Sequence, residues 1–326
     1  MEIKKVIGVI ICVAFCFYEI SGTSFISASK IEMSGDTWKY DFALKTLVFV
    51  GNQSIDGNAS LDGHSTEPKW YKFANKTEHL IIGEGVTGIG KGAFYGFKKL
   101  ESVDMADTVT RIDTWAFHDC INLKKINFSN SLKRIEDGAL SGCWSLKKIE
   151  LPNQIQSIGT FSECTKLKKV IIPQSVHKIL PKTFMNCVSL TSVRLPVGLK
   201  KIDKKLFKNC KILKSVNIPS TVEIVYMSAF SGTGIRKISL NENVTQIKNG
   251  TYSGEKVFKK YDTDDYETKN LRLIEIKSKK VKSIAKGSFS GLSSKVVVKV
   301  PKSRKKKYTK MLRESGLEKK VKIKTL

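Results

Sequence analysis

Histidine, proline and acidic residues are scarce in this chain of 326 residues. It has 4 histidines and 7 prolines, and its 30 acidic residues are outnumbered by 57 basic ones. The resulting formal net charge of +27 favours anionic partners: cell-wall polyanions, acidic glycans, anionic membrane surfaces and nucleic acid. After residue 18 the sequence has no further long apolar run, so it predicts no membrane span in the rest of the chain.

The few histidines also oppose an enzymatic function. All four stand in different sequence contexts, and only His118 lies near a cysteine, Cys120. A nucleophile needs a base within hydrogen-bond reach and a third group that orients the base. Cys120 occupies a regular repeat position, where a thiolate would be desolvated. We therefore predict no enzyme, no catalytic residue, no cofactor and no metal ligand.

The N-terminus is typical of an export signal. A basic start precedes an apolar run of 13 residues at 6–18, which is too short to span a bilayer, and small residues follow at 27–29. We predict that residues 1–29 are removed and that the protein is secreted, extracellular or on the cell surface. An uncleaved anchor is the first alternative. Lipidation of Cys16 is the second, and the bulky Phe15 before it opposes that alternative.

Cysteine is used periodically. Five of the seven cysteines follow the predicted signal, at spacings of 23, 21, 23 and 23 residues: Cys120, Cys143, Cys164, Cys187 and Cys210. This spacing equals the period of the repeat described next, so each thiol has the same place in successive turns. A ladder of reduced, buried thiols is the favoured interpretation, since buried cysteine behaves as a small hydrophobe. Disulfides between adjacent turns and metal binding are the alternatives.

One short unit recurs from about residue 80 to about residue 300. Its first apolar residue stands at Leu80, Val103, Ile126, Ile149, Val170, Val193, Val216 and Ile238. A second apolar residue follows two positions later, as in Val216 and Ile218, and this alternation predicts a short strand with one buried face. Pro219 then ends the strand, because proline donates no ladder hydrogen bond. The unit continues with a second apolar pair, such as Val109 and Ile112, and closes on a phenylalanine and a corner leucine.

The repeat predicts a leucine-rich-repeat-like solenoid. Short parallel β-strands and short helical or 3-10 turns would stack over residues 80–300, in about eight or nine turns of about 23 residues. A polar loop is expected to be inserted at 254–270. Residues 30–79 are assigned to an N-terminal β cap. Residues 301–326 are assigned to a C-terminal helical cap, with a helix near 302–315 and a final strand near 321–323.

The unit Leu-x-x-Val-x-Ile-Pro-x-x-Val-x-x-Ile-x-x-x-Ala-Phe-x-x-Cys-x-x-Leu resembles the BspA-like leucine-rich repeats of bacterial surface proteins. The resemblance covers residues 80–300, and the flanking segments that contain Trp70 and Tyr308 also look like the ends of such proteins. It implies an exported, non-enzymatic protein that binds proteins or glycans through its repeat surface. Two departures are a two-residue deletion before Phe161 and Leu140 in place of the usual phenylalanine.

Two other motifs carry weaker signals. Gly83, Gly85 and Gly88 match the dinucleotide-binding fingerprint by their letters, but the fingerprint requires a preceding strand and a following helix. Here it falls at the turn of the first repeat. The acidic residues at 262–267 offer oxygen ligands for calcium, but they lack the glycine and the spaced glutamate of a calcium loop. A solvated loop is the favoured interpretation.

Basic residues recur at the two positions after the corner leucine. They are Lys124, Lys125, Lys147, Lys148, Lys168, Lys169, Lys214, Arg236 and Lys237. Stacking would place the equivalent residues of successive turns in rows, with neighbours in a row about 4.8 Å apart. These rows would form an electropositive strip. Like charges at that distance repel by about 1 kcal/mol in water, which the fold can tolerate. A soluble lysine-rich face and a binding strip for an anionic ligand are both open, and Glu101, Asp104 and Glu150 weaken the strip locally.

The leading hypothesis is a secreted or surface-associated binding solenoid that acts in adhesion or host interaction. Its partner would be an extracellular protein, or an anionic glycan or cell-wall polymer. The main alternative is a structural wall-associated protein held to anionic polymers by its charge. Nucleic-acid binding through charge alone would be non-specific in sequence and steeply dependent on salt. The oligomeric state is left open.

Overall fold

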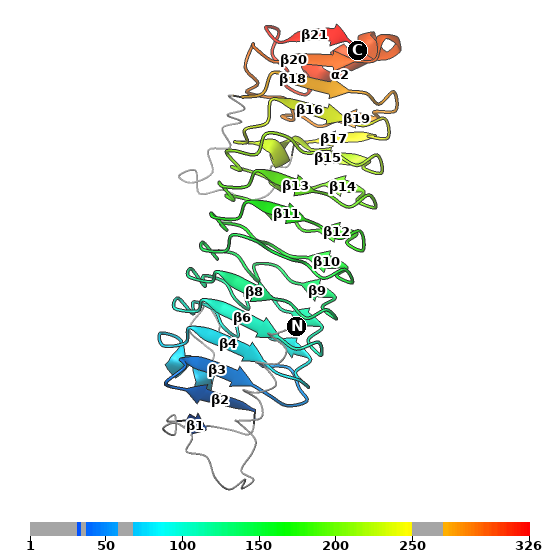
Figure 1. The fold of residues 1–326 in the computed structure, drawn as a ribbon. Coiled ribbons are helices and arrows are strands. Elements are labelled where there is room, and N and C mark those ends of the chain that lie inside the picture. Colours follow the sequence, from blue (N-terminus) through cyan, green and yellow to red (C-terminus); the bar gives the residue numbers. More distant parts are fainter. Residues whose placement is uncertain (1–30, 34–36, 58–67, 250–269) are drawn as a thin grey trace, which may run out of the picture. The chain divides into compact units, whose positions relative to one another are not determined.

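A first row of parallel strands runs through the repeats, one strand in most turns (Figure 1). Leu80 pairs with Val103, Val103 with Ile126, and Val170 with Val193, as predicted for the first apolar residue of each unit. The row consists of β3 (Thr46–Phe49), β4 (His79–Ile82), β6 (Ser102–Met105), β8 (Lys125–Asn127), β11 (Lys169–Ile171), β13 (Ser192–Arg194), β16 (Lys237–Leu240), β18 (Leu273–Ile276), β20 (Val297–Val300) and β21 (Lys322–Thr325). The protein is thus a β-solenoid of leucine-rich-repeat type, with about ten turns.

This computed structural model describes residues 31–33, 37–57, 68–249 and 270–326. The described part belongs to one unit, Ile31–Leu326. The predicted export signal lies outside the described residues, as do the acidic segment at 262–267 and all but the last residue of the predicted insertion. Across that insertion β16 pairs with β18 in register, so the first row continues from one side to the other.

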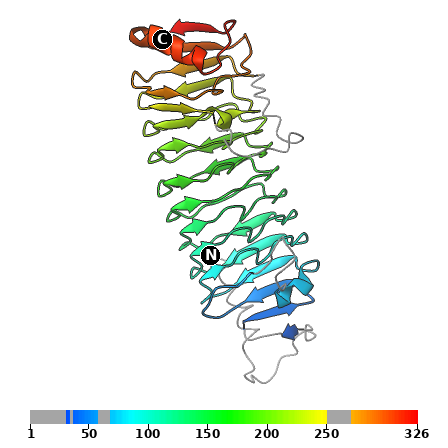
Figure 2. The same cartoon turned by 180° about the vertical axis from the view of Figure 1, so that it is seen from behind.

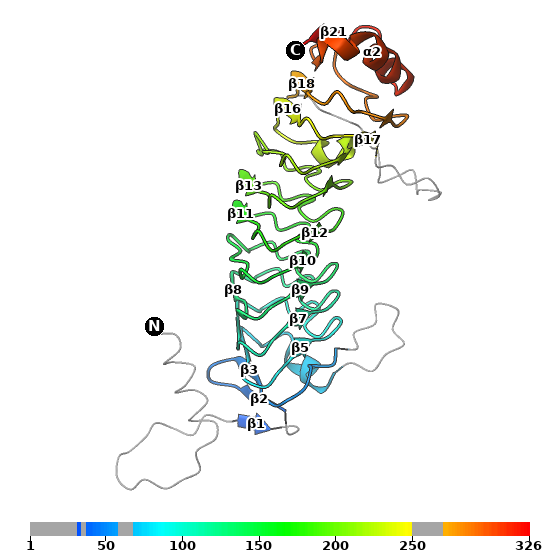
Figure 3. The ribbon, with the colours of Figure 1, turned by 90° about the vertical axis from the view of Figure 1, so that its right-hand side faces the viewer.

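A second row of strands lies on the other side of each turn, as Figure 3 shows from the side and Figure 2 from behind. It consists of β5 (Gly88–Ile89), β7 (Arg111–Ile112), β9 (Arg134–Ile135), β10 (Ser157–Ile158), β12 (Lys178–Ile179), β14 (Lys201–Ile202), β15 (Ile224–Tyr226), β17 (Gln246–Lys248) and β19 (Ser283–Ile284). The sequence marked the apolar pair of each unit, but a strand of two or three residues is too short to show alternation. Each of these segments is identified as a strand only by its parallel pairing with the segment of a neighbouring turn.

The phenylalanine turns form the third side of the core. The Phe161, Phe184 and Phe207 side chains are fully buried and stacked, with neighbouring ring centroids 6.0 Å apart. The backbone repeats with them: Phe184 N–H donates to the Leu206 carbonyl (3.0 Å), and Phe207 N–H donates to the Ala229 carbonyl (2.9 Å). Each turn therefore supplies both the apolar cover and the backbone partners of its neighbour.

The first row is interrupted twice where the sequence predicts a strand: at Ile149, where only the Lys148–Lys169 bridge forms, and at Val216 and Ile218. Residues 215–218 form no strand, and among the described residues no ladder pairing joins them to β13 or β16. The prediction of a strand there is wrong, although the inward residue Ile218 is buried as expected. The alternating pattern fixes which side chains turn inward, but it does not fix the distance to the neighbouring strands on which hydrogen bonding depends.

The two-residue deletion before Phe161 removes a backbone acceptor. Elsewhere the N–H at this turn donates to a carbonyl of the next turn, as Trp115 does to Asp137 (3.2 Å). Gly138 N–H instead donates to the Thr160 hydroxyl oxygen (2.7 Å), and that hydroxyl donates in turn to the Asp137 carboxylate (3.1 Å). The side chain of Thr160 thus replaces the missing backbone group.

Aromatic side chains cover the N-terminal end of the repeats. The two strands expected there form as β2 (Trp38–Asp41) and β3, while β1 (Ile31–Met33) was not predicted. The Tyr40 ring stacks on Phe73 at 4.1 Å, next to η1 (Lys69–Phe73). The Trp70 indole N–H donates to the Ala93 carbonyl of the first repeat (3.0 Å). The assignment of residues 30–79 as a cap remains a prediction.

A helix follows the last repeats, as the sequence predicts. Pro301 ends β20, and η3 (Lys302–Arg304) leads into α2 (Lys305–Glu314), which buries Tyr308 and Leu312. The Tyr308 hydroxyl donates to the Ser278 carbonyl (3.0 Å) and accepts from Val281 N–H (3.0 Å), which ties the helix to the last turn. The other short helix, η2 (Met227–Phe230), lies within the repeats. The C-terminal cap also remains a prediction.

We predict that Phe184→Ala lowers the free energy of unfolding by about 3–5 kcal/mol, because it leaves a cavity between two stacked rings. Chemical denaturation monitored by circular dichroism would measure the loss. Ile171→Ala is the control, since Ile171 is 66% exposed and should cost little. A loss below about 1 kcal/mol for Phe184→Ala would contradict the packing role of this ring.

We also predict that Thr160→Val destabilises the protein by about 1–3 kcal/mol, because the buried Gly138 N–H loses its acceptor while side-chain volume is kept. Thr191→Val is the matched control, because the exposed Thr191 hydroxyl donates to the Lys168 carbonyl and water can take over that bond in the variant. The same denaturation experiment compares the two. Equal stabilities of the two variants would show that Gly138 does not depend on Thr160.

Candidate functional site

The nine basic residues predicted to form a strip are all exposed. They stand just before, or at the first residue of, the first-row segments. The backbone confirms that neighbouring members adjoin: Lys168 N–H donates to the Lys147 carbonyl (3.2 Å), and Lys148 forms a bridge with Lys169. Thr191 interrupts the rows in the turn of β13, so the strip is not continuous.

Three members of the strip are paired with carboxylates. The Lys124 ammonium lies 2.7 Å from a Glu101 carboxylate oxygen, and Lys148 forms an ion pair with Glu150. The hydrogen bond from Lys148 holds the pKa of Glu150 below its ordinary value. The Lys237 ammonium lies 3.0 Å from a Glu275 carboxylate oxygen. These charges are locally neutralised, as the acidic residues in the sequence indicated for Glu101 and Glu150.

The centre of the strip has no such neutralisation. Lys147, Lys168 and Lys169, which we call the central lysine cluster, have no carboxylate within ion-pair distance among the described residues. The same holds for Lys125, Lys214 and Arg236, which lie farther along the strip. The members of the central lysine cluster reinforce one another's field, because separations of about 5 Å are shorter than the Debye length of roughly 8 Å in physiological salt. The largest unpaired positive field of the strip is therefore expected here.

In the second row, Arg111, Arg134 and Lys201 each have an acid two positions later, whereas Lys178 has no carboxylate within ion-pair distance among the described residues. The Arg111 guanidinium lies 3.4 Å from an Asp113 carboxylate oxygen, and the Lys201 ammonium lies 2.7 Å from an Asp203 carboxylate oxygen. Residues two positions apart on a strand point to the same side, so the base and the acid form a pair within one turn. The first row is the candidate anion-binding surface because unpaired lysines lie there in adjacent turns.

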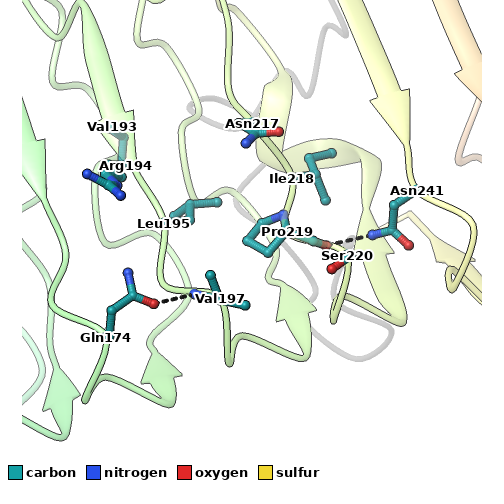
Figure 4. Close-up of a pocket in the computed structure, with 10 residues that line it drawn as sticks. All are labelled: Gln174, Val193, Arg194, Leu195, Val197, Asn217, Ile218, Pro219, Ser220 and Asn241. Carbon is teal, nitrogen blue, oxygen red and sulfur yellow. Dashed lines mark hydrogen bonds between the residues drawn. The ribbon is translucent and has the colours of Figure 1, made fainter.

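A groove of about 550 Å³ opens at the second interruption of the first row (Figure 4). Val193, Leu195 and Ile218 line it with apolar surface, and Arg194 and Asn217 add polar groups. The groove exists because residues 215–218 do not close onto β13. Sequence reasoning missed it, since the pattern at this unit is as regular as elsewhere and predicts a closed sheet.

Side chains brace the two turns that border the groove. The Val197 backbone N–H donates to the Gln174 side-chain oxygen (2.8 Å), and the Asn241 side-chain amide donates to the Pro219 carbonyl (2.7 Å), as Figure 4 shows. These bonds replace part of the missing ladder at the edge of the opening. They hold the opening without filling it.

A second groove, of about 830 Å³, lies near the C-terminal helix. Lys277, Lys279 and Lys302 line it together with Glu242. The sequence did not indicate this basic site, because its residues come from three separate segments that only the stacking of turns brings together.

The cysteines lie inside the solenoid as free thiols. All five are buried, and each donates from sulfur to a carbonyl of the preceding turn, 26 residues earlier in four cases, as Cys187 does to Phe161 (3.2 Å), and 24 residues earlier for Cys164. Burial raises the pKa of every one of these thiols, that of Cys187 to about 12. The predicted ladder of reduced cysteines is confirmed, and the alternative of disulfides between adjacent turns is wrong.

The structure does not join His118 to a nucleophile. Its ring stacks on Tyr95 at 5.3 Å and lies 3.3 Å from the Asp119 carboxylate, while the Cys120 sulfur donates to the Phe94 carbonyl. The described residues hold no group of three or more histidine, cysteine or acidic side chains that could bind a metal ion. In the same part of the chain, no helix is both long and apolar enough to cross a membrane.

The glycine fingerprint belongs to a turn between two strands. β4 ends at Ile82 and β5 begins at Gly88, so the helix that dinucleotide binding requires is replaced by a strand. Gly85 has φ +88°, and a Cβ there would lie 2.4 Å from the Gly51 carbonyl oxygen. Close packing against the preceding segment therefore explains this glycine.

Comparison with known families agrees with the repeat. The sequence matches the BspA type leucine rich repeat region, in six copies, over residues 66–181 and 159–260. The chain therefore belongs to this family. A search of curated proteins gives no match.

Solved structures of bacterial leucine-rich repeat proteins are similar to this chain. One from Eubacterium ventriosum is 20% identical, with an alignment that covers 84% of this chain and 78% of that chain and a TM-score of 0.51. One from Bacteroides ovatus is 22% identical over 93% of this chain and 77% of its own, with a TM-score of 0.49. The leucine-rich repeat protein of T. pallidum is 27% identical over 60% of this chain and 85% of its own, with a TM-score of 0.47. The first of these supports the fold.

We predict that the five repeat cysteines react slowly with a thiol reagent in the folded protein at pH 8 and rapidly in guanidinium. Because burial raises their pKa, the folded thiols stay protonated at pH values where unfolded thiols ionise. The stability that these thiols contribute is therefore fully present below the unfolded pKa of about 8.5 and is lost as the pH rises above it. Mass spectrometry after timed labelling would identify each site. Rapid labelling of Cys143 in the folded protein would contradict its buried position.

Proposed function

We propose that this protein is an exported, non-enzymatic scaffold, secreted or held at the cell surface, which binds an extracellular protein or an anionic glycan in adhesion or host interaction. Membership of the BspA type family supports this proposal, as do the signal-like N-terminus and the excess of basic residues. Stacked turns present the same outward position again and again, and such extended surfaces suit large partners better than small substrates.

The central lysine cluster is the observation that carries the proposal. Three lysines in two adjacent turns are exposed without counter-charges, whereas Arg111, Arg134 and Lys201 of the second row each pair with an acid two residues away. A face needed only for solubility does not require this difference. An anionic polymer that follows the stack would meet one positive charge or more in each of two successive turns.

The cysteines and His118 support a non-catalytic role, because packing already accounts for them. Each thiol fills the core and keeps its proton, and the imidazole is stacked against a tyrosine. A thiolate nucleophile would require the opposite environment, exposed and next to a positive charge.

A structural protein held to anionic wall polymers is the second candidate, and it is favoured by the same lysines together with the basic groove of Lys277, Lys279 and Lys302. The two candidates differ in their dependence on salt. Attachment by charge alone should be released as ionic strength rises, whereas a specific complex with apolar contacts should persist.

We predict that Lys147→Glu, Lys168→Glu and Lys169→Glu together weaken binding to purified wall polymers, acidic glycans or extracellular matrix proteins at least about 100-fold at low salt, if each lysine contributes about 1 kcal/mol next to an anionic surface. The matched control changes three exposed second-row lysines, Lys178, Lys282 and Lys286, to glutamate. Pull-down followed by titration of the bound partner would measure the effect.

Equal binding by both triple variants and the unmodified protein would contradict the proposal that the strip is the binding surface. An equal loss in both variants would show that net charge alone determines binding. Strong binding of any DNA sequence, lost steeply with salt, would favour non-specific nucleic-acid binding instead.

A further inference from the structure

One tryptophan is exposed beside the central lysine cluster. Trp144 has 47% of its surface accessible, whereas Trp38 is 4% exposed within the N-terminal aromatic cluster. Trp70 donates its indole N–H to a backbone carbonyl, and Trp115 is covered by the Lys91 ammonium at 5.2 Å from its ring. Trp144 has no ring contact or indole hydrogen bond among the described residues. Tryptophan is enriched at interfaces, where its ring packs and its N–H finds a partner, so an exposed indole without either is a candidate contact surface.

The fold holds this indole outward at a corner of the solenoid. Cys143 and Leu146, which flank the corner, are fully buried, so the backbone between them must turn its side chains to solvent. Trp144 N–H donates to the Gly142 carbonyl (2.9 Å), and the Trp144 carbonyl accepts from Lys166 N–H of the next turn (3.2 Å). The backbone beneath the ring is therefore fixed on both sides, and the side chain starts from a rigid position.

Lysines adjoin Trp144 along the backbone. Lys166 is the direct backbone neighbour of Trp144 in the next turn, and Lys147 follows three residues after Trp144. Lys168 adjoins Lys147 through the backbone hydrogen bond of 3.2 Å. All three lysines are exposed, and none has a carboxylate within ion-pair distance among the residues that the structure describes. An exposed indole with a free N–H donor thus belongs to the same two adjacent turns as three unpaired lysines.

An acidic sugar has the complementary chemistry. One face of a pyranose ring is lined by C–H groups that pack on a flat indole, its hydroxyl groups can accept from the indole N–H, and its carboxylate can bind an ammonium. We propose that Trp144, with Lys147, Lys166 and Lys168, forms a subsite for an acidic sugar unit of an extracellular polysaccharide. This rests on the proposed function and names its ligand class: a carboxylated glycan.

The surroundings of Trp144 favour a glycan over other anionic partners. Proteins that bind single-stranded nucleic acid stack successive bases on several aromatic side chains, but the equivalent corner positions in the adjacent turns are Ile121 and Thr165. A membrane surface would call for a broad apolar patch, whereas polar Ser145 and the lysines border the ring. A single aromatic platform with lysines in the same two turns matches one acidic sugar ring in a polymer.

The test compares the full chain with Trp144→Ala, titrated with oligosaccharides of alginate, a polymer of uronic acids. Polyglutamate, which has carboxylates without sugar rings, and a neutral mannan oligosaccharide are titrated in parallel. We expect Trp144→Ala to weaken alginate binding at least about fivefold, the lower range for stacking on an aromatic side chain, and to leave polyglutamate binding unchanged. Alginate should also protect the exposed indole from acrylamide quenching.

Val197→Ala is the matched control, since Val197 is 60% exposed and lies outside the subsite, and thermal unfolding confirms that each variant is folded. Unchanged alginate binding by Trp144→Ala would overturn the subsite while leaving the proposed function intact. An equal loss of polyglutamate binding would also overturn it. If the unmodified protein bound neither polyanion, the glycan-binding part of the proposed function would fail as well. Tighter binding of oligo-dT or of anionic lipid vesicles than of alginate would reject the glycan assignment.

Discussion

The stacking of one turn on the next is the constraint on which the rest of this structure depends. A single turn of about 23 residues has too few apolar side chains to exclude water, so its phenylalanine, its cysteine and its strand residues must be covered by the equivalent residues of its neighbours. The ring spacing of 6.0 Å through Phe161, Phe184 and Phe207 shows this cover in its simplest form. The backbone obeys the same rule, because each turn completes the hydrogen bonds of another.

That register also arranges the charges. A position that repeats in sequence becomes a row in space, so a lysine that recurs after the corner leucine cannot avoid lying near the lysine of the next turn. The protein resolves this in two ways. On the second row an acid two residues away neutralises some of the bases, as Asp203 does for Lys201. On the first row the central lysine cluster keeps its charge, and Trp144 stands beside it. Their proximity gives this region its proposed binding role.

Departures from the period show how strict the stacking is. Where two residues are deleted, a side-chain hydroxyl from Thr160 takes over the role of a backbone carbonyl, so the cost of a missing acceptor is avoided. Where residues are inserted, β18 still pairs with β16 in register. Where residues 215–218 do not close onto β13, a groove forms and Gln174 and Asn241 brace its edges. The stack absorbs local irregularity at its surface and keeps its core in line.

The sequence by itself determined the period, the inward positions and the first-row register, because burial of apolar groups depends only on their order along a repeating unit. It therefore predicted the phenylalanine stack, the buried thiols and the exposed rows of lysine. It could not show the second row, whose strands are too short to alternate, nor the break at residues 215–218. Only the tertiary structure decided which lysines lack a counter-charge and that Trp144 lies among them. Ion pairing and exposure depend on distances between turns of a few ångströms, and no one-dimensional pattern contains those distances.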